Sequence, residues 1–157
     1  MKVRVLFTGK TVDPWIRQGV ELYAGRLRHY VSFELTELPD VRQTSSLSEE
    51  QIKVREGEVI LKALRPGDHL VLLDEHGESF SSVGWARNLE RKIAHLPKDL
   101  VFVIGGPYGF SQALMQRSDG LLSLSRMTFS HQLVRVIFLE QLYRAFTILK
   151  GEPYHHE

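Results

Sequence analysis

The chain has 157 residues, of which 43% are hydrophobic and 25% charged, and its net charge is +1 at pH 7. This composition is typical of a globular protein with a sizeable core, so we expect one domain over residues 1–157. The lack of cysteine excludes disulfide frameworks, thiol catalysis and Cys-based zinc sites. No run approaches 18 consecutive apolar residues, and residues 1–5 alternate like a strand, so we expect a cytoplasmic protein without membrane contact.

Strand and helix patterns alternate along the whole chain. Short β-branched runs and period-two alternation indicate strands, whereas a proline at a first helical position and the capping box of Ser48 and Gln51 indicate helix starts. We predict strands over residues 3–7, 33–38, 69–74, 100–104 and 121–124, and helices over residues 14–30, 48–65, 83–96, 111–118 and 131–150. Residues 39–47 are predicted to form a polar loop. Five alternations without an internal repeat predict an α/β fold with a mostly parallel sheet and helices on both faces.

Three of the predicted strands end in segments suited to ligand binding. In open parallel sheets, ligands bind beyond the carboxyl ends of the strands. The third strand ends at Leu73 and Asp74, and the fourth ends at Gly105 and Gly106, whose backbone a ligand could approach closely. The fifth strand leads into a polar loop before a helix, which turns backbone N–H groups toward a bound molecule. The glycine run is neither G-x-G-x-x-G nor a P-loop, which disfavours a Rossmann dinucleotide site.

The last predicted helix carries one charge in its apolar stripe. Arg135 shares that stripe with Phe138, Leu139, Leu142 and Phe146. Because an unpaired buried charge is costly, Arg135 should have an anionic or carbonyl partner, in either a structural pair or a functional role. The apolar surface of this helix is wider than one stripe, so we also expect a homodimer.

The polar tail over residues 151–157 has two interpretations. Terminal residues are frayed by default. Alternatively, Gly151 ends the helix and Pro153 stiffens the path, so that Tyr154 and His155 are held close to the ligand edge of the sheet. The adjacent histidines lack a third clear ligand, so we expect no metal site.

Two weaker patterns leave alternatives open. Residues 1–30 carry a local basic excess, which either contacts phosphates or forms the solvated face of a helix. Ser130 beside His131 suggests a small hydrolase that turns over esters without a cofactor. The chain has no G-x-S-x-G elbow, however, and neighbours in sequence need not face each other in space.

Six motifs together resemble those of the RlmH family, bacterial methyltransferases that modify N3 of a pseudouridine in 23S ribosomal RNA. The motifs are Leu72-Leu73-Asp74, Ile104-Gly105-Gly106-Pro107-x-Gly109, Ser123-Leu124-Ser125-x-Met127-Thr128, His131-x-Leu133-Val134-Arg135-Val136, Leu142-Tyr143-Arg144-Ala145 and Pro153-Tyr154-His155. Their order and spacing span the whole chain, so the joint match is specific although each piece alone is not.

The resemblance implies a SPOUT-type fold with a C-terminal trefoil knot, a dimer with sites near the subunit interface, and S-adenosylmethionine as methyl donor. It places the donor on Leu73, Asp74, Gly105, Gly106, Ser125, Arg126, Met127, Thr128, Phe129 and Ser130. The chemistry needs a proton acceptor for N3, for which His131 or His155 is a candidate. Arg135 could stabilise the resulting anion, and Tyr154 could stack on the base or bind its edge.

The resemblance also points to the form of the RNA. A small enzyme with a thin basic patch should bind isolated RNA poorly, so we expect 23S ribosomal RNA to be recognised within the assembled ribosome or large subunit. The family's tail often has a basic residue where this chain has His156, which makes that charge dependent on pH. The alternative is a non-catalytic ribosome-associated binding module with the same fold.

Overall fold

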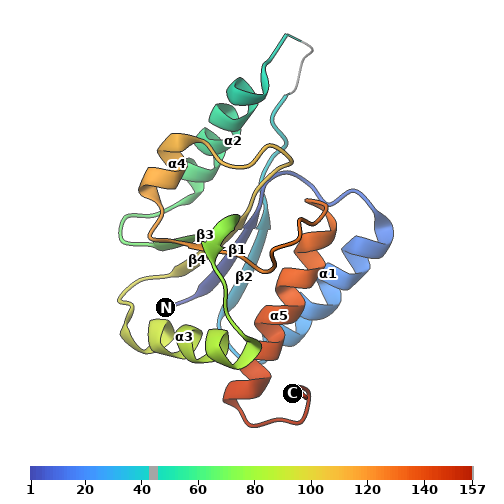
Figure 1. Cartoon of the computed structure of the whole chain (residues 1–157), viewed down its shortest axis with the longest axis vertical. Helices are drawn as coiled ribbons and strands as arrows, with labels where there is room; N and C mark the ends of the chain where they lie inside the picture. The colour runs from blue at the N-terminus through green and yellow to red at the C-terminus, as the bar shows by residue number, and fades with distance from the viewer. Residues whose placement is uncertain (43–45, 157) are drawn as a thin grey trace.

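A five-stranded sheet lies between two layers of helices in the computed structural model, which describes residues 1–42 and 46–156 (Figure 1). The strands are β1 (Val3–Phe7), β2 (Phe33–Glu37), β3 (His69–Glu78), β4 (Leu100–Ile104) and β5 (Gly120–Leu122). The helices are α1 (Pro14–Leu27), α2 (Glu49–Ala63), α3 (Ser82–His95), α4 (Gln112–Arg117) and α5 (Leu133–Leu149). The strand order is β2-β1-β4-β3-β5, and every pairing is parallel. The predicted α/β fold is therefore confirmed.

The alternation of side chains along the strands builds a core on each face of the sheet. Val3, Val5 and Phe7 of β1 pack with α1, α3 and α5, while Leu6 of the same strand packs with α2 and α4. Figure 1 shows the same division, with α1 and α5 side by side and α2 and α4 together on the other side. Both faces of the sheet are thus covered, which explains why β1 and β4 are entirely buried.

Three of the helices have a serine as their N-cap residue. Ser48 accepts a hydrogen bond from Gln51 N (3.1 Å), and Gln51 Oε1 accepts one from Ser48 N (2.8 Å), which confirms the capping box. Ser81 and Ser111 cap α3 and α4 in the same way through their hydroxyl groups. Asp13 precedes α1 as predicted, but its carboxylate makes no capping hydrogen bond.

The two largest differences from the predicted boundaries are at the third strand and the first helix. The third strand does not end at residue 74 but runs to Glu78, because Leu73 and Glu78 both pair with Leu122 on either side of an irregular register. Gly77 permits this return, since a Cβ there would lie 2.5 Å from the Leu121 backbone. The first helix ends at Leu27, followed by turns. Part of the loop predicted over residues 39–47, residues 43–45, lies outside the described residues.

The family-implied trefoil knot stays a prediction, since strand order alone does not establish how the chain is threaded. In the described part of the chain, no helix is both long enough and apolar enough to span a membrane.

Candidate active site

A cavity of about 530 Å³ lies at the carboxyl ends of β3, β4 and β5. Its walls are formed by residues 73–76 within β3, the loop over residues 105–110 after β4, and residues 122–125 and 127–129 around the end of β5. His131 and Val134 close the side next to α5. The volume falls within the range of small-molecule and cofactor sites. Segments that are far apart in the sequence thus meet at one edge of the sheet, as the position of ligand sites in parallel sheets predicted.

Most of the predicted donor-binding residues line this cavity, and two do not. The lining includes Leu73, Asp74, Gly105, Gly106, Ser125, Met127, Thr128 and Phe129. Arg126 and Ser130 are exposed and lie outside the lining. The donor residues were taken from the family resemblance, so sequence reasoning missed other residues that line the cavity. These include Lys53 on α2, Glu75, His76, Phe110 and Leu122 to Leu124.

Gly105 and Gly106 are required by the protein packed behind them. A Cβ at Gly105 would lie 2.9 Å from the Phe110 ring. A Cβ at Gly106 would lie 2.7 Å and 3.0 Å from the carboxylate oxygens of Glu56 on α2. These distances are shorter than ordinary van der Waals contacts, so a side chain at either position would displace its neighbour. The sequence suggested close approach of a ligand as the reason for these glycines, and the structure supplies a second reason.

Hydrogen bonds within the loop fix its path from β5 to α5. The Ser123 hydroxyl donates to the carbonyl of Ser125 (2.9 Å), and the Ser125 hydroxyl accepts from Met127 N (3.0 Å). The Ser130 hydroxyl accepts from Gln132 N (3.2 Å) and Leu133 N (3.4 Å), so it satisfies free N–H groups at the start of α5. This explains why the helix begins at residue 133 rather than 131.

Two side chains in the cavity wall, His131 and Asp74, could take part in acid–base chemistry or bind a ligand. Burial, together with the positive charge of Arg135, lowers the pKa of His131 below its ordinary value. His131 is therefore held as neutral imidazole at pH 7, the form that accepts a proton. Asp74 Oδ1 accepts hydrogen bonds from the backbone N (2.9 Å) and Nδ1 (3.0 Å) of His76, which fixes the carboxylate within β3.

Arg135 is fully buried and faces the segment after β1. Its Nη1 donates to the carbonyl of Gly9 (3.1 Å) and the hydroxyl of Thr11 (2.9 Å). Its Nη2 donates to the carbonyl of Thr8 (3.0 Å), and Glu37 Oε2 lies 3.6 Å from Nη1. The expectation of carbonyl and anionic partners is confirmed. Arg135 does not line the cavity, and its catalytic role stays a prediction.

The C-terminal tail is held along α5. The Tyr154 hydroxyl donates to Glu140 Oε1 (3.0 Å), and its ring packs against Tyr143 at a centroid distance of 4.8 Å. Arg144 lies over the Tyr154 ring, and its Nη1 donates to Nδ1 of His155 (3.1 Å). Burial, Tyr23 and Glu140 raise the pKa of Tyr154, so its hydroxyl keeps its proton. The tail is thus neither frayed nor held at the ligand edge of its own chain, which were the two interpretations of its sequence.

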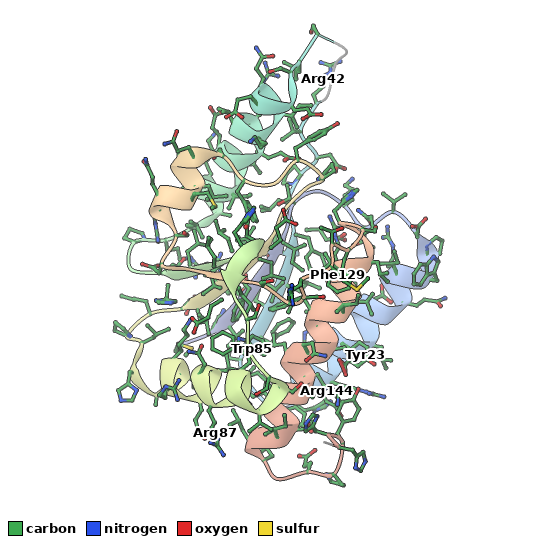
Figure 2. The ribbon with its side chains drawn as sticks, viewed as in Figure 1. Tyr23, Arg42, Trp85, Arg87, Phe129 and Arg144 are labelled. Carbon is green, nitrogen blue, oxygen red and sulfur yellow. The ribbon has the colours of Figure 1, made fainter. Side chains whose placement is uncertain are left out.

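The candidate catalytic residues therefore form two separate groups. His131 lines the cavity before α5 begins, whereas Tyr154 and His155 are held by Glu140 and Arg144, two and three turns along the helix. These turns place the holding residues roughly 10 and 16 Å from the start of α5, at 1.5 Å per residue. Figure 2 shows the two regions, with Phe129 at one end of α5 and Arg144 well along it. Within residues 1–42 and 46–156, no three potential metal ligands come together.

Known proteins resemble this chain over its full length. The family model described as "Predicted SPOUT methyltransferase" matches residues 1–155. The chain belongs to the SPOUT methyltransferase family. "Ribosomal RNA large subunit methyltransferase H" of Parabacteroides distasonis is 52% identical over 157 residues, covering 100% of both chains. The proteins of that name from Bacteroides fragilis and Flavobacterium johnsoniae are 50% and 49% identical, again over 100% of both chains. Membership of the SPOUT methyltransferases confirms the resemblance seen in the motifs.

Replacing Gly106 with Ala should destabilise the protein, because the new Cβ would push against the Glu56 carboxylate. We expect the free energy of unfolding to fall by about 1–3 kcal/mol, measured by chemical denaturation. The same change in a Glu56→Ala background should cost markedly less, since the obstacle is gone. Gly25→Ala is the control, because a Cβ there meets no atom within 4 Å. An equal cost of the Gly106 change in both backgrounds would show that Glu56 is not the constraint.

Proposed function

We propose that this SPOUT methyltransferase transfers a methyl group from S-adenosylmethionine to N3 of a pseudouridine in 23S ribosomal RNA. The observation that carries the proposal is the cavity at the strand ends, in which the glycine loop and the loop over residues 125–129 meet a neutral His131. The relatives of closely similar sequence are named as ribosomal RNA large subunit methyltransferases, which supports the substrate class.

The residues around the cavity fit such a donor. Apolar side chains, among them Leu73, Phe110 and Leu124, offer a surface for an adenine ring. Ser125, Thr128 and the backbone of Gly106 offer polar groups for the ribose and the amino acid part. A neutral nucleophile or its anion reacts with the donor in line, so the main contribution of the protein is to hold both partners in position.

The proton on N3 has to leave when the methyl group arrives. When bound, S-adenosylmethionine supplies the methyl group from a positively charged sulfonium. His131 accepts the N3 proton, which its lowered pKa permits because the imidazole starts out neutral. Tyr154 keeps its proton, which it donates to Glu140, so the role left to it is to stack its ring on the base. Arg135 does not line the cavity, so its positive charge acts indirectly, by helping burial to lower the pKa of His131.

We further propose that the complete active site is shared between two subunits of a homodimer. In one chain, His131 lies at the cavity while Tyr154 and His155 lie along α5, away from it. A second copy that packs against α5 could bring its tail to this cavity. Met127 and Phe129 support such a contact, because they are apolar, 77% and 39% exposed, and lie in the cavity wall.

The partner RNA is proposed to be recognised within the ribosomal large subunit or the ribosome, which places the enzyme in the cytoplasm. The net charge of +1 is too small to hold naked RNA strongly by counterion release. Shape and several RNA contacts on the particle would then supply the affinity that charge does not.

The activity is tested with purified protein, tritiated donor and ribosomal particles from cells that lack this methylation. We expect methyl transfer to particles and little to a short oligonucleotide, with the product located by mass spectrometry of the 23S RNA. Donor binding is measured separately by titration calorimetry. Binding of particles without donor binding or transfer would favour the alternative of a non-catalytic ribosome-associated module, and equal rates on both RNAs would contradict recognition of the particle.

The acidic limb of the pH–rate profile should report His131. A base must be neutral to act, and its pKa is lowered, so kcat should stay high down to below pH 6.5 and fall as the imidazole becomes protonated. His131→Gln should lower kcat by roughly 10²- to 10⁴-fold and remove this limb. An unchanged acidic limb in that variant would assign the base elsewhere, with His155→Gln as the next candidate to test.

Mixed dimers test the shared site. His131→Gln and Tyr154→Phe/His155→Gln chains should each be inactive alone, since each homodimer lacks one group at both sites. After mixing and exchange, about half of the dimers are mixed, and each has one intact site, so activity should recover to roughly a quarter of the wild-type value. No recovery, with subunit exchange confirmed by native mass spectrometry, would place all these groups in one chain.

A further inference from the structure

Glu56 is a buried carboxyl group behind the wall of the cavity. It lies on α2, is 7% exposed, and its Oε1 has no hydrogen-bond partner among the described residues. Gly106, which lines the cavity, packs directly against both of its carboxylate oxygens. Since Gly106 has no side chain, its backbone lies between this carboxyl group and the cavity.

A carboxylate in this position needs a compensating positive charge. Burial raises the pKa of Glu56, and the negative charge of Asp40 raises it further, so the protein itself disfavours the charged form. Lys53 lies one turn earlier on α2 and lines the cavity, but its ammonium group pairs with Glu50 Oε2 at 3.0 Å. Within residues 1–42 and 46–156, no ion pair links Glu56 to a cation. A cationic ligand in the cavity would supply the missing charge.

The donor and product of methyl transfer differ in that charge. The sulfonium of S-adenosylmethionine loses its methyl group and its positive charge together, leaving a neutral thioether in S-adenosylhomocysteine. A carboxylate close to the cavity therefore attracts the donor and not the product. A carboxylate behind the cavity wall still attracts a cation in the cavity, because the effective dielectric constant within a protein is far below that of water.

We propose that Glu56 is a positioning residue that acts through Gly106 and makes the cavity selective for the cationic donor over its neutral product. This inference rests on the proposed function. The contact fixes the glycine loop from behind, and the carboxylate charge favours release of the product once the methyl group has been transferred.

The test compares the affinities of both ligands by titration calorimetry. Glu56→Gln keeps the shape of the side chain and removes the charge, so S-adenosylmethionine should bind about three- to tenfold more weakly, with S-adenosylhomocysteine changed less than about twofold. Glu58→Gln is the matched control, because Glu58 is an exposed acid on the same helix. It should change neither affinity. Glu56→Met provides a second neutral variant, and thermal unfolding checks that both variants are folded.

The other outcomes are equally informative. Equal weakening of both ligands in the two Glu56 variants would show a packing role alone and overturn the selectivity. Unchanged affinities would also overturn it. Failure of the wild-type protein to bind either ligand would instead contradict the proposed donor site, so the two proposals fail in different ways.

Discussion

The buried guanidinium of Arg135 connects the three parts on which the site depends. It joins the first turn of α5 to the segment after β1 through Thr8, Gly9 and Thr11, and its charge is balanced by Glu37 at the end of β2. Its side chain also lies over the Phe7 ring, 4.7 Å from the centroid. Because α5 begins where the loop over residues 125–131 ends, this anchor also fixes the loop that forms one wall of the cavity.

This anchor has an electrostatic consequence for the neighbouring turn. Water screens a buried positive charge poorly, so the Arg135 charge disfavours protonation of the nearby His131. Burial is the main cause of the lowered pKa of His131, and the residue that holds α5 in place lowers it further. Packing and acid–base chemistry are coupled here, and a variant of Arg135 would change both together.

The sequence was sufficient to predict features that depend on local pattern or on general topology. Parallel strands end at one edge, so Asp74, Gly106 and Ser125 could be placed together without knowledge of the strand order. The partners of Arg135 could be predicted by chemical type but not by identity. Thr8, Gly9 and Thr11 follow β1, whereas Glu37 ends the neighbouring strand β2, and only the packing of α5 against the sheet brings all of them to Arg135.

The burial of Glu56 and the position of the tail could not be predicted from local sequence pattern. Glutamate is favoured on solvated helix surfaces, so nothing in the sequence distinguishes Glu56 from the exposed Glu58. The burial of Glu56 follows from the way α2 packs against the glycine loop. The sequence left open whether the tail is frayed or held at the sheet edge. In the structure Gly151, with a φ of +69°, turns the chain back along α5, where Glu140 and Arg144 bind it.

The rigidity of α5 makes the division of the candidate catalytic residues significant. A helix holds its two ends at a fixed separation, and the tail is tied to it by a hydrogen bond, a ring contact and the Arg144 guanidinium. Tyr154 and His155 cannot approach the cavity of their own chain without breaking those contacts. In the proposed shared site, the tail would come from a second subunit and would keep these contacts. Chemistry that needs both groups at one base therefore favours a dimer on geometric grounds, independently of the apolar width of α5.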